Sequence, residues 1–124
     1  MTADLDRLGA EKYVLLTTFR KDGSAVPTPV WVARDGDELV MYSAPDAGKV
    51  KRIRRDGTVR IAPCTVGGKP TGPEVTGQAR LLDEPGIRAT QALLARKYGI
   101  TYRLVTLGGI FRKTLPAGIA VKLD

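Results

Sequence analysis

The chain has 124 residues, of which 43% are hydrophobic, and it carries a formal net charge of +7. This composition excludes a disordered chain and fits one folded domain over residues 1–124. The sequence has no histidine and a single cysteine, so Ser-His-Asp catalysis, histidine-ligated metals and an internal disulfide are excluded, and we expect no metal site. No apolar run approaches the roughly 20 residues of a membrane helix, and acids occupy the N-terminus where a signal peptide has bases, so we predict a cytoplasmic protein.

The first 43 residues predict one short helix and three strands joined by hairpins. Leu5 and Leu8 lie three positions apart, as on one face of a helix. Asp22-Gly23 and the similar pair Asp35-Gly36 are typical of tight turns between strands. The expected elements are a helix over Thr2–Glu11 and strands over Lys12–Phe19, Ser24–Ala33 and Glu38–Ser43.

The remaining residues predict further helices and three more strands. Asp46 is a candidate N-cap for one helix, and Pro85 suits the first turn of another. The expected elements are helices over Ala47–Arg55, from Asp83 or Glu84 to about Tyr98, and over Thr101–Lys113, with strands over Thr58–Thr65, Glu74–Leu82 and Ala117–Lys122. About six short strands with appended helices predict a mainly β fold, a small antiparallel barrel.

The densest group of charges lies on and just after the helix predicted over residues 47–55. It consists of Lys49, Lys51, Arg52, Arg54, Arg55 and Arg60. A helix N-terminus presents free backbone amides and the positive end of the helix dipole, which suits a phosphate group. Two interpretations stay open: an ordinary solvated helix face, and a phosphate cradle formed by the helix start, Lys49 and the preceding Tyr42-Ser43.

The only tryptophan lies on a strand interrupted by prolines. Pro27 and Pro29 cannot donate to a ladder, so this strand is expected at an edge or with interrupted pairing. Backbone amides freed from pairing could hydrogen-bond a planar heterocycle; alternatively, Trp31 is a core or dimer-interface residue and the prolines block an edge. The glycine-rich stretch Gly67–Gly72 is typical of a hairpin loop, and Cys64 is expected to be buried.

A series of short motifs occurs in a fixed order along the chain. They are Thr17–Ser24, Pro29–Val32, Asp35–Leu39, Met41–Ser43, Gly48–Ile53 and Arg55–Val59. In order and spacing the series resembles the pyridoxamine-phosphate-oxidase-like split β-barrel superfamily, and most of all its short actinobacterial branch that uses the deazaflavin coenzyme F420. The resemblance implies a six-stranded antiparallel split barrel that works as a homodimer with two cofactor sites at the subunit interface.

The resemblance also implies which residues bind the cofactor. One group borders the ring system, a second lies beside the phosphate, and Lys49 binds the phosphate with help from the following backbone amide. The implied residues are Thr28, Pro29, Val30, Trp31, Tyr42, Ser43, Lys49 and Val50. Flavin-mononucleotide (FMN) oxidases of the superfamily usually have an arginine directly before that lysine, where this chain has Gly48. This departure favours the deazaflavin over FMN.

The implied function is an oxidoreductase that passes a hydride from reduced coenzyme F420 to a small unsaturated or carbonyl-containing substrate. The alternatives are an FMN-binding oxidase or reductase of the same fold, and a cofactor carrier without turnover. Nucleic-acid binding is disfavoured because the basic helix lacks the interleaved aromatics of a single-strand platform, and no membrane partner is expected. The sequence singles out no catalytic residue and no substrate.

Overall fold

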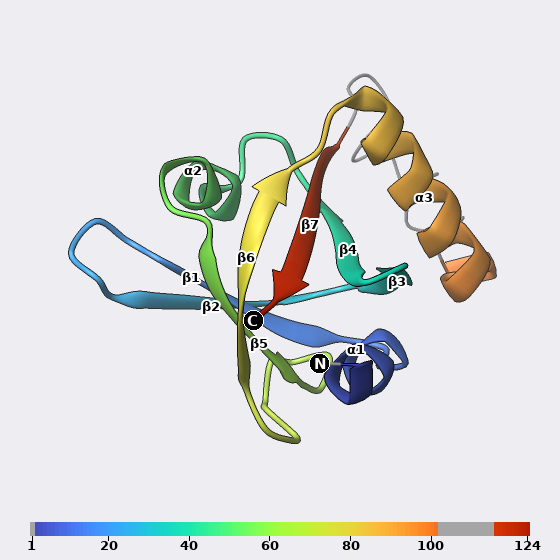
Figure 1. The fold of residues 1–124 in the computed structure, drawn as a ribbon, viewed down its shortest axis with the longest axis horizontal. Helices are drawn as coiled ribbons and strands as arrows, with labels where there is room; N and C mark the ends of the chain where they lie inside the picture. Colours follow the sequence, from blue (N-terminus) through green and yellow to red (C-terminus); the bar gives the residue numbers. More distant parts are fainter. Residues whose placement is uncertain (1, 102–115) are drawn as a thin grey trace.

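The structure, a computed structural model, describes residues 2–101 and 116–124. The described residues form three helices and seven antiparallel strands (Figure 1). In chain order these are α1 (Thr2–Gly9), β1 (Val14–Phe19), β2 (Ala25–Val30), β3 (Ala33–Asp35), β4 (Glu38–Ser43), α2 (Gly48–Arg55), β5 (Thr58–Pro63), β6 (Val75–Leu81), α3 (Glu84–Tyr98) and β7 (Ala117–Leu123). The prediction of a mainly β, antiparallel fold with short helices is confirmed.

The strands form one sheet in the order β2-β1-β5-β6-β7-β4-β3. β2 and β3 follow each other in the chain, yet they lie at opposite edges of this sheet. The sheet therefore curls so that its two edges are linked by the short connection at Trp31 and Val32, which makes a split barrel.

The prediction of six strands was wrong at this connection, where one expected strand, Ser24–Ala33, is divided in two. The physical reason is a change of hydrogen-bond partner. The amide of Val32 donates to the hydroxyl of Tyr98 at 3.1 Å rather than to a neighbouring strand. A hydrogen bond to a side chain 66 residues further along the chain thus replaces a bond between strands. No local pattern in the sequence predicts this contact.

Alternate residues of the strands pack on two sides of the sheet. On β4, Leu39 and Met41 face the inside of the barrel, while Val40 and Tyr42 face outwards towards α3. The inner core is formed by Leu5, Leu8, Val14, Leu16, Val30, Val32, Leu39, Met41, Ile53, Val59, Ile61, Ile119 and Val121. The outer cluster is smaller and is closed by Leu94 of α3. In Figure 1, α2 and α3 accordingly lie on opposite sides of strands β4, β6 and β7.

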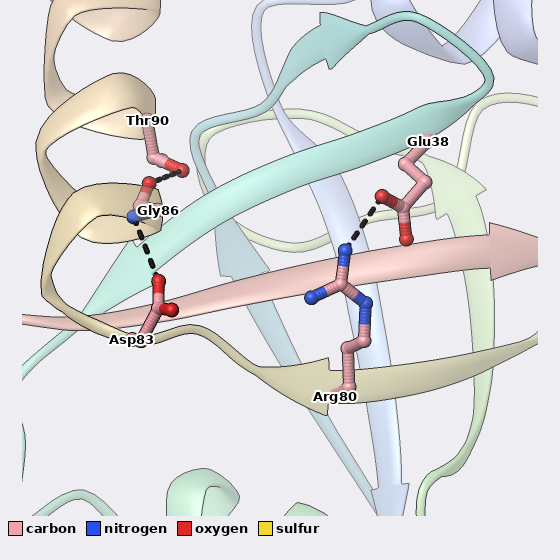
Figure 2. A network of polar contacts seen from close by, with 5 residues as sticks. All are labelled: Glu38, Arg80, Asp83, Gly86 and Thr90. Carbon is pink, nitrogen blue, oxygen red and sulfur yellow. Dashed lines mark hydrogen bonds and ion pairs between the residues drawn. The ribbon is translucent and has the colours of Figure 1, made fainter.

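The helix starts were predicted with mixed success. α3 begins at Glu84, one of its two predicted starts, and Asp83 caps it, because its carboxylate accepts from the amide of Gly86 at 3.0 Å (Figure 2). At α2 the expected cap Asp46 is wrong: Ala47 holds the N-cap position, with no side-chain bond to the helix. The uncapped start leaves backbone amides of α2 available to another partner.

Other expectations are settled or fall outside the described residues. Cys64 is buried, as predicted, and the glycine-rich segment forms the loop between β5 and β6. The helix expected over residues 101–113 lies almost entirely outside the described residues. Within the described part of the chain, no helix combines the length and apolar character that a bilayer crossing requires.

Candidate functional site

Lys49 lies in the first turn of α2, and the packing of that helix fixes its position. Val50 and Ile53 point into the protein and are 1% and 4% exposed, which holds the helix against the strands. Lys49 is half-buried, and both this burial and the nearby Arg52 lower the pKa of its ammonium group. Among the described residues, its ammonium group has no ion pair or hydrogen bond. A cation in this position is costly unless an anion joins it.

A cation-lined hollow of about 400 Å³ adjoins the same helix. We call it the cationic hollow; its lining consists of Arg20, Lys21, Lys51, Arg52 and Arg55. The first two belong to the turn between β1 and β2, and the others to α2. No carboxylate lines the hollow, so like charges face one another there. The pKa of Arg52 is lowered, first by burial and then by the neighbouring positive charges of Arg20 and Arg55.

The hollow is built by contacts between α2 and the end of β1. The Nε of Arg52 donates to the Thr18 hydroxyl at 2.6 Å, and Arg55 donates to the carbonyl of Phe19. These bonds hold two guanidinium groups in place without neutralising them. Preorganised cations of this kind suit carboxylate or phosphate groups.

Arginines elsewhere in the described residues are placed differently, because several of them form ion pairs. Figure 2 shows Arg80 of β6 reaching across β7 to Glu38 at 2.8 Å. The other pairs are Arg7–Asp4, Arg34–Asp6, Arg60–Glu74 and Arg88–Glu84. Within the described part, no ion pair involves α2 or the lining of the cationic hollow.

Trp31, predicted to border the ring system, and Tyr42, predicted to lie beside the phosphate, both lie on the outer face of the sheet. The Trp31 ring is stacked on Tyr98 of α3, with centroids 4.4 Å apart and planes at 9°. Tyr42 lies beside the same indole at 6.2 Å and 13°. Trp31 and Tyr42, expected at different parts of the cofactor, thus lie side by side, and α3 packs against them.

Two residues in the C-terminal turn of α3 hold this aromatic group in place. Lys97 donates to the carbonyl of Val32 at 2.6 Å, and Tyr98 forms hydrogen bonds to backbone groups; we call the two residues the Lys97–Tyr98 clamp. The Tyr98 hydroxyl donates to the carbonyl of Lys12 at 2.7 Å while it accepts from the amide of Val32. Burial raises the pKa of Tyr98 to about 12. A phenol so engaged and so weakly acidic is a structural group and a poor proton donor.

The strand β2 carries Thr28, Pro29 and Val30 along an edge of the sheet. Its register places Pro29 opposite Leu15 and Pro27 opposite Thr17. Prolines lack an amide hydrogen, so they can occupy only the non-hydrogen-bonded positions of this ladder. The open edge therefore offers carbonyl oxygens at both prolines, and the amide of Thr28 faces β1. In the expected strand Ser24–Ala33 the amide of Val32 does leave the ladder, but the Tyr98 hydroxyl accepts from it, so this donor is in use.

The remaining predicted residues lie near α2 with their polar groups in use. Ser43 is buried, and its hydroxyl donates to the carbonyl of Ala44 at 3.2 Å. The amide of Val50 donates to the carbonyl of Ala47 at 3.1 Å. Of the predicted phosphate ligands, Lys49 therefore has the most available donor. Sequence reasoning missed Thr18, Arg20 and Lys21, because no local pattern places a turn 30 residues upstream beside α2.

The chain is similar in sequence to one known protein family. The model of the family described as pyridoxamine 5'-phosphate oxidase matches residues 3–117. The chain belongs to this family. None of the curated proteins matches the chain significantly. The superfamily expected from the sequence is thereby confirmed.

Solved structures share the fold of this pyridoxamine 5'-phosphate oxidase family member at low sequence identity. An F420 reductase is 19% identical, with a TM-score of 0.65, and the match covers 96% of this chain and 92% of that one. A conserved hypothetical protein from Mycobacterium tuberculosis is 17% identical, with a TM-score of 0.72 and coverage of 96% and 77%. The heme storage protein HutZ from Vibrio cholerae is 8% identical, with a TM-score of 0.71 and coverage of 99% and 87%. These likenesses establish the fold.

Proposed function

We propose that this chain binds coenzyme F420 and uses it as an oxidoreductase, passing a hydride to a small unsaturated or carbonyl-containing substrate. The observation that carries the proposal is Lys49, a half-buried ammonium group with no ion pair among the described residues, placed at the uncapped start of α2. An anionic group there would satisfy both the lysine and the helix amides. Phosphate is the part of a flavin-like cofactor with that chemistry.

The choice of the deazaflavin over FMN is supported by two features of the chain. Gly48 precedes the lysine where FMN oxidases resembling this chain have an arginine. The cationic hollow lies on the same helix, and coenzyme F420 carries an acidic oligoglutamate tail in addition to its phosphodiester. These cations, which have no ion pair among the described residues, would attract such a polyanion and orient it before binding.

The bound coenzyme would supply the hydride chemistry, and the residues of the chain would bind and orient it. Lys49 would hold the phosphate beside Tyr42 and Ser43, and Trp31, which the Lys97–Tyr98 clamp keeps in place, would border the ring system. The chain contains no histidine, so a proton for the substrate would come from water or a tyrosine. Tyr98 is unsuited to that task because its hydroxyl is bonded to backbone groups.

The site is proposed to lie at the interface of a homodimer. β2 pairs only with β1 among the described residues, so the strand with Thr28 and Pro29 has an open edge. A second copy against this edge would cover the ring system from the side that one chain leaves open. Sedimentation velocity with and without coenzyme F420 tests this part of the proposal.

The decisive experiment is a pair of binding titrations, with coenzyme F420 and with FMN, on the wild-type protein. We expect the deazaflavin to bind more tightly. Lys49→Ala should lose about tenfold or more in affinity, because it removes a charge-assisted hydrogen bond to the phosphate. Lys69→Ala, which removes an exposed lysine in the β5–β6 loop, is the matched control and should bind normally.

The outcomes separate the candidate functions. Tighter binding of FMN would favour the FMN oxidase or reductase instead. Unchanged affinity in Lys49→Ala would refute the phosphate cradle. Tight binding without oxidation of the reduced coenzyme across a panel of enones and quinones would identify a cofactor carrier. Heme binding is less favoured, because the chain lacks histidine, a common axial ligand.

A further inference from the structure

The side chain of Arg52 folds back over the first residue of α2. A Cβ atom placed on Gly48 would lie 2.8 Å from the Nη1 of Arg52, which is closer than such atoms approach. Long helical side chains point towards the N-terminus of their helix, so residue 52 naturally covers residue 48 one turn earlier. The absence of a side chain at Gly48 is what lets the guanidinium group lie there.

The guanidinium group is held in this position from the other side. Its Nε donates to the Thr18 hydroxyl at 2.6 Å, and Thr18 is 0% exposed. One edge of the guanidinium group is thus tied to β1, while Nη1 is directed to the surface of α2 over Gly48. An arginine held at one edge keeps a fork of N–H donors for an anion and loses little side-chain entropy when it binds.

Within the described residues, no carboxylate neutralises the charge of Arg52. It lines the cationic hollow together with four other cations, and no carboxylate is among them. It also lies close enough to Lys49 to lower the pKa of that ammonium group. Arg52 therefore stands between Lys49 and the cationic hollow, and an anion bound there would relieve the repulsion on both sides.

We propose that Arg52, anchored by Thr18 and admitted by Gly48, is a second phosphate-binding residue beside Lys49. The inference rests on the proposed function for the identity of the ligand, the phosphodiester of coenzyme F420. It assigns direct contact with the phosphate to Arg52, whose charge alone would suggest only that it attracts the acidic tail of the coenzyme. It also gives Gly48 a role: the glycine makes room for a guanidinium group that comes from one helical turn later.

Three substitutions test the arrangement. Arg52→Gln removes the fork, Thr18→Val removes the anchor with little change in shape, and Gly48→Ala displaces the guanidinium group. Arg54→Gln is the matched control: it removes the same charge from an exposed position of α2 that does not line the cationic hollow. Each variant is titrated with coenzyme F420 and with inorganic pyrophosphate, and its thermal unfolding is recorded.

We expect Arg52→Gln to lose about tenfold or more in affinity for coenzyme F420, and Thr18→Val and Gly48→Ala to lose several-fold, with Arg54→Gln close to wild type. Gly48→Ala is the sharpest variant, because alanine favours helices over glycine and the melting temperature should hold or rise while affinity falls. A purely structural role for Gly48 predicts that stability and affinity change together.

Equal losses of affinity in Arg52→Gln and Arg54→Gln would overturn the inference, since both arginines would then act only through the overall electrostatic field of the protein. Unchanged affinity in Gly48→Ala and Thr18→Val would overturn it as well. If the wild type binds pyrophosphate but not coenzyme F420, the proposed function fails, and the inference stands only if Arg52→Gln weakens pyrophosphate binding more than Arg54→Gln does. Binding of neither probe refutes both.

Discussion

Lys97 at the end of α3 and Lys49 at the start of α2 both carry partly desolvated ammonium groups, although Lys97 as a residue is exposed, and they show opposite solutions to this problem. Burial lowers the pKa of both ammonium groups. Lys97 donates to three backbone carbonyls, those of Gly9 at 2.9 Å, Glu11 at 2.5 Å and Val32 at 2.6 Å. Lys49 has no such partner among the described residues.

The contrast shows which of the two ammonium groups is still available to bind a ligand. The Lys97 ammonium group satisfies the carbonyls of Gly9, the last residue of α1, and of Glu11 just beyond it, and it ties them to the connection between β2 and β3. Its desolvation is offset within the protein. Among the described residues nothing offsets the desolvation of Lys49, which is why we propose it as the phosphate ligand.

The largest expected effect comes from removing each lysine in turn. Lys97→Met should lower the free energy of unfolding by about 2 kcal/mol, because three carbonyls lose a charged donor. Lys49→Met should change it by less than about 0.5 kcal/mol, because no bond within the described residues is lost. Urea denaturation of both variants measures the difference. Similar losses in the two would show that Lys49 also has a structural partner.

The pH dependence of cofactor binding sharpens the same comparison. The pKa of Lys49 in the free protein lies below its ordinary value of 10.5. A bound phosphate favours the ammonium form, so binding takes up a proton in the window between the lowered pKa and the raised pKa of the complex. Affinity should therefore fall as pH rises through the free-state pKa of Lys49, by at most about tenfold per pH unit.

Lys49→Arg serves as the control for this measurement, since a guanidinium group stays charged throughout the range. Titrations between pH 7 and pH 10 should show a flatter profile for this variant than for the wild type. A parallel decline in both proteins would assign the pH dependence to another group.

The smallest expected effect concerns the hydroxyl of the clamp. Tyr98→Phe removes the bonds to Lys12 and Val32 but keeps the ring that stacks on Trp31. We expect a loss of about 1 kcal/mol in unfolding free energy and an altered near-ultraviolet dichroism of Trp31, the only tryptophan. Tyr13→Phe is the control, because the Tyr13 hydroxyl makes no hydrogen bond within the described residues. Equal stability of the two variants would refute the clamp.

Local signals in the sequence predicted most of the elements. The Asp-Gly turns predicted the hairpins around them, and the helix predicted over Ala47–Arg55 matches α2, with Lys49 near its start. The candidate cap Asp46 was wrong because side-chain capping depends on the exact exit path of the preceding loop. Local propensity does not fix that path.

The sequence by itself determined the mainly β character, the helix that carries Lys49 and the excess of positive charge. The tertiary structure decided where those charges meet. It divided the expected strand at Trp31 and Val32, and it placed Thr18 and Arg20 beside Arg52 to form the cationic hollow. Thr18 and Arg52 are 34 positions apart, and Val32 and Tyr98 are 66 apart. Such bonds depend on how the whole chain closes into a barrel, whereas patterns in sequence report only on neighbours within a few residues.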